Sequence, residues 1–206
     1  MGAWEGGVLA PNGKIYGIPN AADAVLIIDP ATNTADTATL AVSNVGGKYL
    51  GAALAPNGKI YFVPHAAAQV LVVDPATNTT DTSSIGGLGA DGSKWFGGEH
   101  ATNGRIYAIP YAASSVLIID PSTDTASNTA MSLPAGGAWA GGVLGGNGKI
   151  YGIPTKTPGP VLIVDPMANT ADLTSMVLPG AVGSWIGGVL RPTARSMASR
   201  TRPVPC

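Results

Sequence analysis

Three sets of residues in this 206-residue chain have types and spacings that could do chemistry. The first set is Glu5, Glu99 and His100, which stand where similar stretches of the chain carry apolar or small residues. Carboxylates and imidazoles bind divalent metals and transfer protons, so these are the candidate catalytic residues. A metal-dependent hydrolase needs about three or four such groups at one point. Neighbours such as Glu99 and His100 would point to opposite faces of a strand, so scattered substitution remains the alternative interpretation.

The second set is an Asp-x3-Asn-x2-Asp pattern, formed first by Asp29, Asn33 and Asp36. It recurs twice in full and once with serine in the last position: Asp74, Asn78, Asp81; Asp165, Asn169, Asp172; and Asp120, Asp124, Ser127. Three oxygen ligands this close together would suit Ca²⁺. Asp followed by Pro, Thr and Asn is also the ordinary chemistry of a capped turn, and we favour that interpretation because no glycine-centred ligand loop accompanies the pattern.

The third set is a recurring aromatic residue, with members Trp4, Tyr49, Trp95, Trp139 and Trp185. Each ring could offer a stacking platform for a sugar, which would give several equivalent ligand sites. A large ring beside small residues can instead wedge between neighbouring layers of structure and bury apolar area. The sequence favours the wedge, since buried aromatic residues are common in repeat cores.

Composition limits the elements that can position these residues. The chain has 29 Gly, 17 Pro and 11% charged residues, which disfavours long helices and favours short strands with tight turns. Net charge is −1, so a nucleic-acid partner is not expected. Apolar runs fall short of the roughly 18 residues of a membrane helix, and no leader-like segment precedes Trp4, so neither a membrane span nor a signal peptide is expected. The compartment stays unassigned.

A repeat of about 45 residues organises the chain. Asn-Gly recurs at Asn12, Asn57, Asn103 and Asn147, and Asp-Pro recurs at Asp29, Asp74, Asp120 and Asp165. The first unit predicts strands at residues 4–10, 14–19, 24–29 and, more polar, 36–42. Asn-Gly between the first two strands indicates a hairpin turn, in which both residues tolerate positive φ.

A four-stranded unit of this length, repeated, predicts an all-β fold, the β-propeller, with antiparallel blades. The blades are expected at residues 4–48, 49–94, 95–138 and 139–184, with the first strand of a fifth at 185–190. Paired glycines such as Gly97-Gly98 suit an innermost strand crowded around the axis.

The repeat also resembles a known family. The order Pro-Asn-Gly, Lys-Ile-Tyr-Gly-Ile-Pro and Val-Leu-Ile-Ile-Asp-Pro-Ala-Thr-Asn-Thr within residues 11–34 resembles the YVTN-type propeller repeat, and the likeness extends over residues 4–190. Ile-Pro stands where that family has Val-Thr-Asn. The resemblance implies a propeller of more than four blades and no single activity, because family members serve as surface proteins, binding scaffolds or enzymes.

Residues 191–206 break the repeat, with four Arg and the chain's one Cys. A permitted codon set for them, read with one G restored in front, gives Ala-Pro-Asn-Gly-Lys-Ile-Tyr-Gly-Ile-Pro, which is the missing continuation. We therefore expect a one-base frameshift after Leu190 and an irregular tail. On this hypothesis the tail's charge and Cys206 are accidents of reading frame.

These observations lead to one functional hypothesis and two alternatives. The hypothesis is a non-enzymatic binding or scaffold module that holds a glycan or protein on its loop face, since equivalent blades give equivalent shallow sites. One alternative is a metal-dependent lactonase or esterase-like hydrolase with its site at the propeller axis. The other is a truncated fragment of a longer array without a function of its own. Ca²⁺ is the one cofactor considered, and uncovered blade faces predict self-association.

Overall fold

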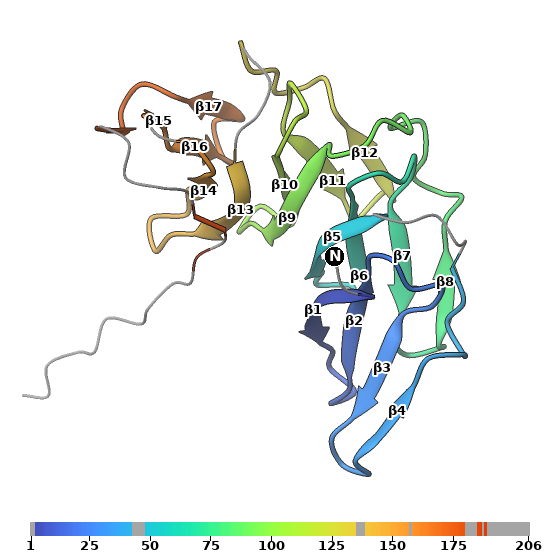
Figure 1. Ribbon diagram of the computed structural model, residues 1–206. Coiled ribbons are helices and arrows are strands. Elements are labelled where there is room, and N and C mark those ends of the chain that lie inside the picture. Colours follow the sequence, from blue (N-terminus) through green and yellow to red (C-terminus); the bar gives the residue numbers. More distant parts are fainter. Residues whose placement is uncertain are drawn as a thin grey trace, which may run out of the picture.

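The fold is all-β, as predicted, and consists of successive four-stranded antiparallel sheets (Figure 1). The computed structural model describes residues 3–42, 48–134, 139–156, 158–179, 185–186 and 188. Within these residues the chain forms strands and turns without helix, and so contains no helical segment that could cross a membrane. The tail 191–206 and the frameshift hypothesis lie outside the described residues.

Each sheet follows the chain order of its strands from the axis outward, as the blade of a propeller does. Blade 1 comprises β1 (Trp4–Leu9), β2 (Ile15–Pro19), β3 (Leu26–Asp29) and β4 (Thr34–Asp36). Blade 2 comprises β5 (Tyr49–Leu54), β6 (Ile60–Pro64), β7 (Leu71–Asp74) and β8 (Thr79–Asp81). Blade 3 comprises β9 (Trp95–His100), β10 (Ile106–Pro110), β11 (Leu117–Asp120) and β12 (Thr125–Ser127). Blade 4 comprises β13 (Trp139–Leu144), β14 (Ile150–Pro154), β16 (Leu162–Asp165) and β17 (Thr170–Asp172).

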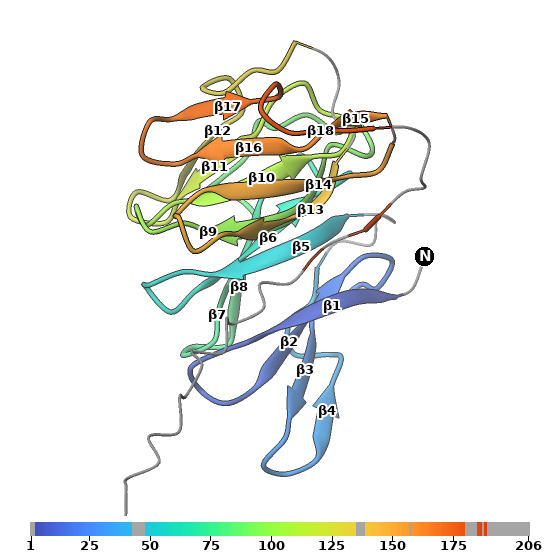
Figure 2. The ribbon, with the colours of Figure 1, turned by 90° about the vertical axis from the view of Figure 1, so that its left-hand side faces the viewer.

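A small additional sheet pairs β15 (Gly159–Pro160) with β18 (Val177–Leu178). Figure 2 shows it at the same end of the blades as the N-terminus. The predicted fifth-blade strand at 185–190 is described only at Trp185, Ile186 and Gly188, and these three residues are not part of a strand.

The outermost strand begins and ends earlier than predicted. Sequence polarity suggested residues 36–42, whereas β4 covers Thr34–Asp36. Asp36 Oδ1 accepts hydrogen bonds from the backbone N–H groups of Ala38, at 2.7 Å, and Thr39, at 3.0 Å, so the chain turns immediately after it. The prediction was wrong because it took the polar residues after Asp36 as a strand, although the aspartate caps a turn there.

The Asn-Gly hairpins also differ in detail from the prediction. Gly13 takes the positive φ of 80°, but Asn12 is not among the positive-φ residues. Asn12 instead uses its side chain: Oδ1 accepts the N–H of Lys14 at 3.1 Å, and Nδ2 donates to the hydroxyl of Tyr16 at 3.0 Å. The asparagine therefore links the turn to the strand that follows it.

Glycines let the innermost strands of blades 2, 3 and 4 approach one another closely. A Cβ on Gly51 would lie 2.5 Å from the Cα of Gly97, and one on Gly97 would lie 2.7 Å from the Cα of Gly141. All three residues have positive φ and sit at a bulge in their strands. The inner strands are thus crowded around the axis, as predicted, and at these glycines their backbones pack directly against one another.

The apolar cores lie between blades. Tyr49 contributes to the core between blades 1 and 2, Trp95 to that between blades 2 and 3, and Trp139 to that between blades 3 and 4. Each core combines β-branched and tyrosine side chains from facing sheets, which is how adjacent blades bury their faces.

The blades form an arc that is open between blade 1 and blade 4 (Figure 1). On the outer face of blade 1, Leu26 and Ile28 are half-buried, whereas their equivalents in blade 2, Leu71 and Val73, are fully buried. On the outer face of blade 4, Tyr151 is half-buried, whereas Tyr107 of blade 3 is fully buried. The arc therefore ends in two incompletely covered apolar faces.

Candidate ligand-binding pocket at the axis

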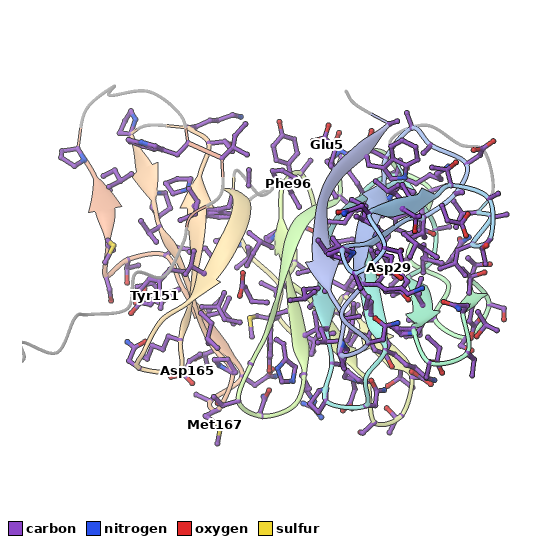
Figure 3. All side chains as sticks on the ribbon, turned by 90° about the horizontal axis from the view of Figure 1, so that it is seen from below. Glu5, Asp29, Phe96, Tyr151, Asp165 and Met167 are labelled. Atoms are coloured by element: carbon purple, nitrogen blue, oxygen red, sulfur yellow. The ribbon has the colours of Figure 1, made fainter. Side chains whose placement is uncertain are left out.

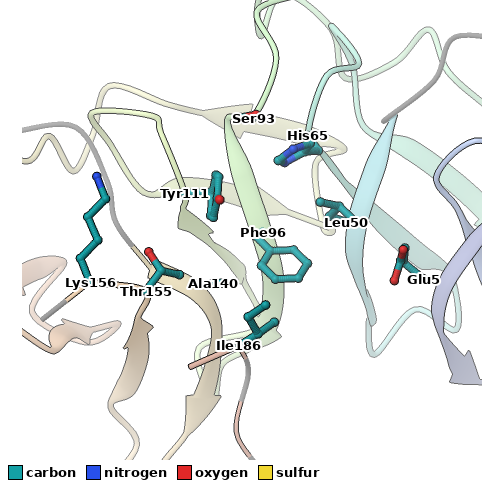
Figure 4. Close-up of a pocket in the computed structure, with 10 residues that line it drawn as sticks. All are labelled: Glu5, Leu50, His65, Ser93, Phe96, Tyr111, Ala140, Thr155, Lys156 and Ile186. Atoms are coloured by element: carbon teal, nitrogen blue, oxygen red, sulfur yellow. The ribbon is translucent and has the colours of Figure 1, made fainter. Parts of the chain in front are cut away.

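A cavity of about 520 Å³ opens on the axis at the end where the innermost strands begin (Figure 4). Half of its lining comes from one repeat position, the residue after the recurring aromatic: Glu5, Leu50, Phe96, Ala140 and Ile186. Propeller geometry brings equivalent positions together around the axis. One repeat position therefore supplies half of the residues that line the pocket. The side chain at this position differs in every unit.

A second repeat position supplies three more lining residues of the pocket. His65, Tyr111 and Thr155 each follow the proline that ends the second strand of a blade, and all three line the cavity. Their equivalent in blade 1, Asn20, is almost fully buried and donates from Nδ2 to the carbonyl of Tyr49 at 3.4 Å. Both repeat positions that line the pocket are therefore positions at which otherwise similar units carry different residues.

Aromatic rings form one wall of this pocket. Phe96 and Tyr111 meet edge to face, with centroids 6.3 Å apart and planes at 82°. The imidazole of His65 lies 5.9 Å from the ring of Tyr111. Tyr111 is 40% exposed, so part of its ring remains open to a ligand. The arrangement supplies an apolar face beside polar edges.

His65 is held in one protonation state. Its Nδ1 lies 3.1 Å from the carbonyl oxygen of Trp95, and because a carbonyl can only accept, Nδ1 carries the hydrogen. Burial lowers the pKa of the imidazole, the hydrogen bond to the Trp95 carbonyl partly opposes this, and the nearby Lys94 ammonium lowers it further, so the net shift is downward. The ring is therefore neutral at pH 7, and its Nε2 can accept a hydrogen bond.

Opposite charges flank the aromatic wall. Figure 4 shows Glu5 of blade 1 and Lys156 of the β14–β15 connection on opposite sides of Phe96. With Thr155 and Ser93 they provide donors and acceptors from blades 1 and 4 and from the connection between blades 2 and 3. The pocket can therefore hold a ligand with an apolar face and several polar groups.

The predicted catalytic residues are divided between two places. Glu5 lines the pocket, whereas Glu99 and His100 lie three and four residues beyond Phe96 on β9, toward the opposite end of the blade. Burial raises the pKa of the Glu99 carboxyl, and a hydrogen bond from the Leu144 N–H partly opposes this. His100 Nε2 is buried without a hydrogen-bond partner among the described residues. The structure does not bring Glu5 together with the other two.

The recurring aromatic residues serve packing in three of the five positions. Tyr49 and Trp95 are each 2% exposed, and Trp139 is buried as well. Trp95 and Trp139 donate from Nε1 to carbonyls of their own blades, at 2.8 Å each. Trp4 makes the same bond, to Ala24 at 2.9 Å, but is only half-buried, and Trp185 is 41% exposed.

The Asp29, Asn33 and Asp36 side chains have separate tasks. Asp29 accepts the N–H of Ala31 at 3.0 Å and pairs with Lys14 at 3.4 Å. Asn33 adopts a φ of 52°, which the turn requires, and Asp36 caps the turn after β4. Among the described residues no group of three or more His, Cys, Asp or Glu side chains is arranged to hold a metal ion.

Sequence reasoning missed Phe96, Tyr111 and Lys156 as pocket residues. It singled out residue types associated with catalysis and the recurring aromatic residues themselves, and neither signal marks the residue after a recurring aromatic or the residues after the strand-ending proline. Aligning the four repeats with one another would have marked both pocket positions, because these positions vary while their neighbours repeat.

The comparisons with known proteins support the fold. No family model matches the chain, and no curated protein matches it. Similar solved structures include virginiamycin B lyase from Staphylococcus aureus, a β-propeller-like protein, with 14% identity and a TM-score of 0.66 over 86% of this chain and 56% of that one. Hydrazine synthase from Kuenenia stuttgartiensis gives 14% identity and 0.66, over 85% and 49%.

An auxiliary nutrient binding protein from Bacteroides ovatus gives 17% identity and a TM-score of 0.57, over 86% of this chain and 42% of that one. The chain thus spans about half the length of the solved structures it resembles. At these identities the likeness shows the fold alone. The chain has a β-propeller-like fold, and proteins sharing it include both enzymes and binding proteins.

Proposed function

We propose that this chain is a non-enzymatic binding module whose axial pocket, on the loop face, takes a carbohydrate. The observation that carries the proposal is the convergence of the two variable repeat positions on one cavity of about 520 Å³. A position that only stabilises its blade has the same residue in every unit, as the positions of the Asn-Gly turn do. Positions that define a shared ligand must differ, because each blade meets a different part of it.

The chemistry of the lining favours a sugar. A pyranose has an apolar face, which can stack on the open part of the Tyr111 and Phe96 rings, and hydroxyls around its edge. His65 Nε2 and Glu5 can accept hydrogen bonds from hydroxyls, and Lys156 can donate one. The volume lies within the range of about 300–1,000 Å³ typical of small-molecule sites. The resemblance of the repeats to the YVTN type also supports this proposal, because that family includes binding scaffolds.

The test is a glycan array with the full chain, followed by calorimetric titration of the best saccharide. Tyr111→Ala should weaken binding about tenfold, since an aromatic anchor at a binding site is commonly worth more than 1 kcal/mol. Met167→Ala is the control: this side chain is 77% exposed at the opposite end of the blades from Phe96, as Figure 3 shows. Equal affinity of both variants would contradict the proposal.

Two further measurements address the enzyme alternative. Lactone and ester turnover should be absent with and without Ca²⁺, and Ca²⁺ should leave saccharide affinity unchanged. Turnover that disappears in Glu99→Gln would overturn the binding proposal in favour of an axial hydrolase.

A further inference from the structure

Each interface between blades contains the same plug and socket. The socket is the Asn-Gly hairpin of one blade, and the plug is the Pro-x-x-Asn/Asp turn of the next. The amide Nδ2 of the socket asparagine donates to the plug proline carbonyl in all three interfaces: Asn12 to Pro75 at 3.1 Å, Asn57 to Pro121 at 3.1 Å and Asn103 to Pro166 at 2.9 Å. All three prolines are buried.

The tyrosine of each socket adds a second contact. Tyr16 donates to Oδ1 of Asn78 at 3.4 Å, and Tyr61 donates to Oδ1 of Asp124 at 2.6 Å. These plug residues have φ near 50°, which fixes the shape of the turn before it docks. The interface between blades therefore combines apolar contacts with specific hydrogen bonds.

Blade 4 carries a socket that none of the described residues fills with a plug. Asn147 Nδ2 donates to the hydroxyl of Tyr151 at 2.9 Å, as in the other blades, and both residues line a cavity of about 240 Å³. In blade 3 the equivalent cavity is about 180 Å³ and is lined in part by Asn169 of the adjoining plug. Blade 4 thus presents a socket of the same composition to the open end of the arc.

Blade 1 carries a plug that meets no socket within the part of the chain that the structure describes. Pro30 is exposed, whereas Pro75, Pro121 and Pro166 are buried. Asn33 already has the φ of 52° found in the docked turns. The apolar face behind this turn, with Leu26 and Ile28, is only half-covered. Plug and face lie at the other end of the same arc (Figure 1).

We propose that a second copy of this chain docks the plug at Pro30–Asn33 into the socket at Asn147–Tyr151, and that the reverse contact closes a two-fold ring of eight blades. A head-to-tail interface closes when its rotation divides the circle, and propellers of four to eight blades are common. The part of this chain that aligns with virginiamycin B lyase covers 56% of it, a little more than half of that protein, so each arc must open slightly for two copies to close a ring of eight blades.

Residues near the C-terminal end of the described chain bear on this docking. A Cβ on Gly188 would lie 3.0 Å from Val143 and 3.3 Å from Ile153, so this segment covers the axial part of the blade 4 face. In the ring, β1 of the second copy takes that place and displaces the segment, so that Glu5 of the second copy replaces Ile186 in the lining of the axial pocket. The socket itself lies at the hairpin end of the face and needs no displacement.

The test is sedimentation of the full chain between about 1 and 100 µM. The expected result is a dimer, and Asn147→Asp should weaken it, since aspartate still accepts the Lys149 N–H but cannot donate to the proline carbonyl. One lost hydrogen bond at each of two equivalent interfaces predicts a dissociation constant about 25-fold higher. Asn103→Asp is the matched control, because its partner lies within the same chain, and it should lower thermal stability while leaving the dissociation constant unchanged.

A cross-linking arm keeps the proposal falsifiable if Asn147→Asp disturbs its hairpin. In a Cys206→Ser background, chains with Asn33→Cys and chains with Tyr151→Cys should be joined by a short bismaleimide linker only when combined, since the length of the tyrosine side chain in this contact leaves the two Cα atoms too far apart for a disulfide. A monomer at 100 µM, or a dimer that Asn147→Asp does not affect and that the linker does not join, would overturn the proposal.

Discussion

Substitution of Gly97 by alanine tests whether backbone contact between inner strands holds the blades together. Gly97 has a φ of +79°, and a Cβ there would lie 2.7 Å from the Cα of Gly141 in the next blade. Real Cβ atoms do not approach backbone this closely, so β9 and β13 must separate to admit the methyl group. Separation also loosens the core between blades 3 and 4, to which Trp139 belongs.

The expected cost has two parts. An alanine held at positive φ costs about 1–2 kcal/mol, and overpacking against a neighbour that cannot move easily costs about 1–3 kcal/mol. The Gly97→Ala protein should therefore lose about 2–5 kcal/mol of unfolding free energy. In a chain of this size that corresponds to a fall in Tm of very roughly 4–20 °C.

Gly104→Ala is the matched control, because Gly104 has a φ of +83° and nothing lies within 4 Å of its Cβ position. It should pay the backbone cost alone, about 1–2 kcal/mol. Urea unfolding followed by tryptophan fluorescence measures both variants. Equal losses, within about 0.5 kcal/mol, would refute the claim that close inner-strand packing carries the difference.

Three other predictions follow from single features. Burial raises the pKa of Tyr49 to about 12 from 10.0, so the phenol stays neutral in the folded chain while the unfolded chain ionises; stability should fall by about 2–3 kcal/mol between pH 10 and 12, and less steeply in Tyr49→Phe, as denaturant titrations at each pH will show. Trp95→Phe should destabilise by about 1–3 kcal/mol because it leaves the buried carbonyl of Ser115 without its donor; the same change at half-buried Trp4 should cost less in thermal melts, and equal costs would contradict this reading. Sequencing the DNA after the Leu190 codon should reveal the missing repeat in a reading frame offset by one base. A DNA sequence that encodes no such repeat in the offset frame would contradict the frameshift hypothesis.

The blade architecture was readable from the sequence because it depends on local, repeated patterns. Alternation in Ile15–Pro19, the apolar run Leu26–Asp29 and the spacing of Asn-Gly to Asp-Pro each act within one unit and recur four times. The error in the fourth strand arose at Asp36, whose carboxylate can either face solvent from a strand or cap a turn. Backbone geometry after β4 decided in favour of the cap.

The pocket depended on relations between units, which no local pattern expresses. Glu5 and Phe96 are separated by two blades in sequence, and both line one cavity only because the arc brings the starts of β1 and β9 to the same axis. Glu99 is an acidic residue on the same strand as Phe96, yet lies toward its opposite end. The sequence by itself determined that blades form and that their faces are apolar, since both follow from residue periodicity. Tertiary structure alone decided which side chains meet at the axis and which faces stay open, because curvature and the number of packed blades set those distances.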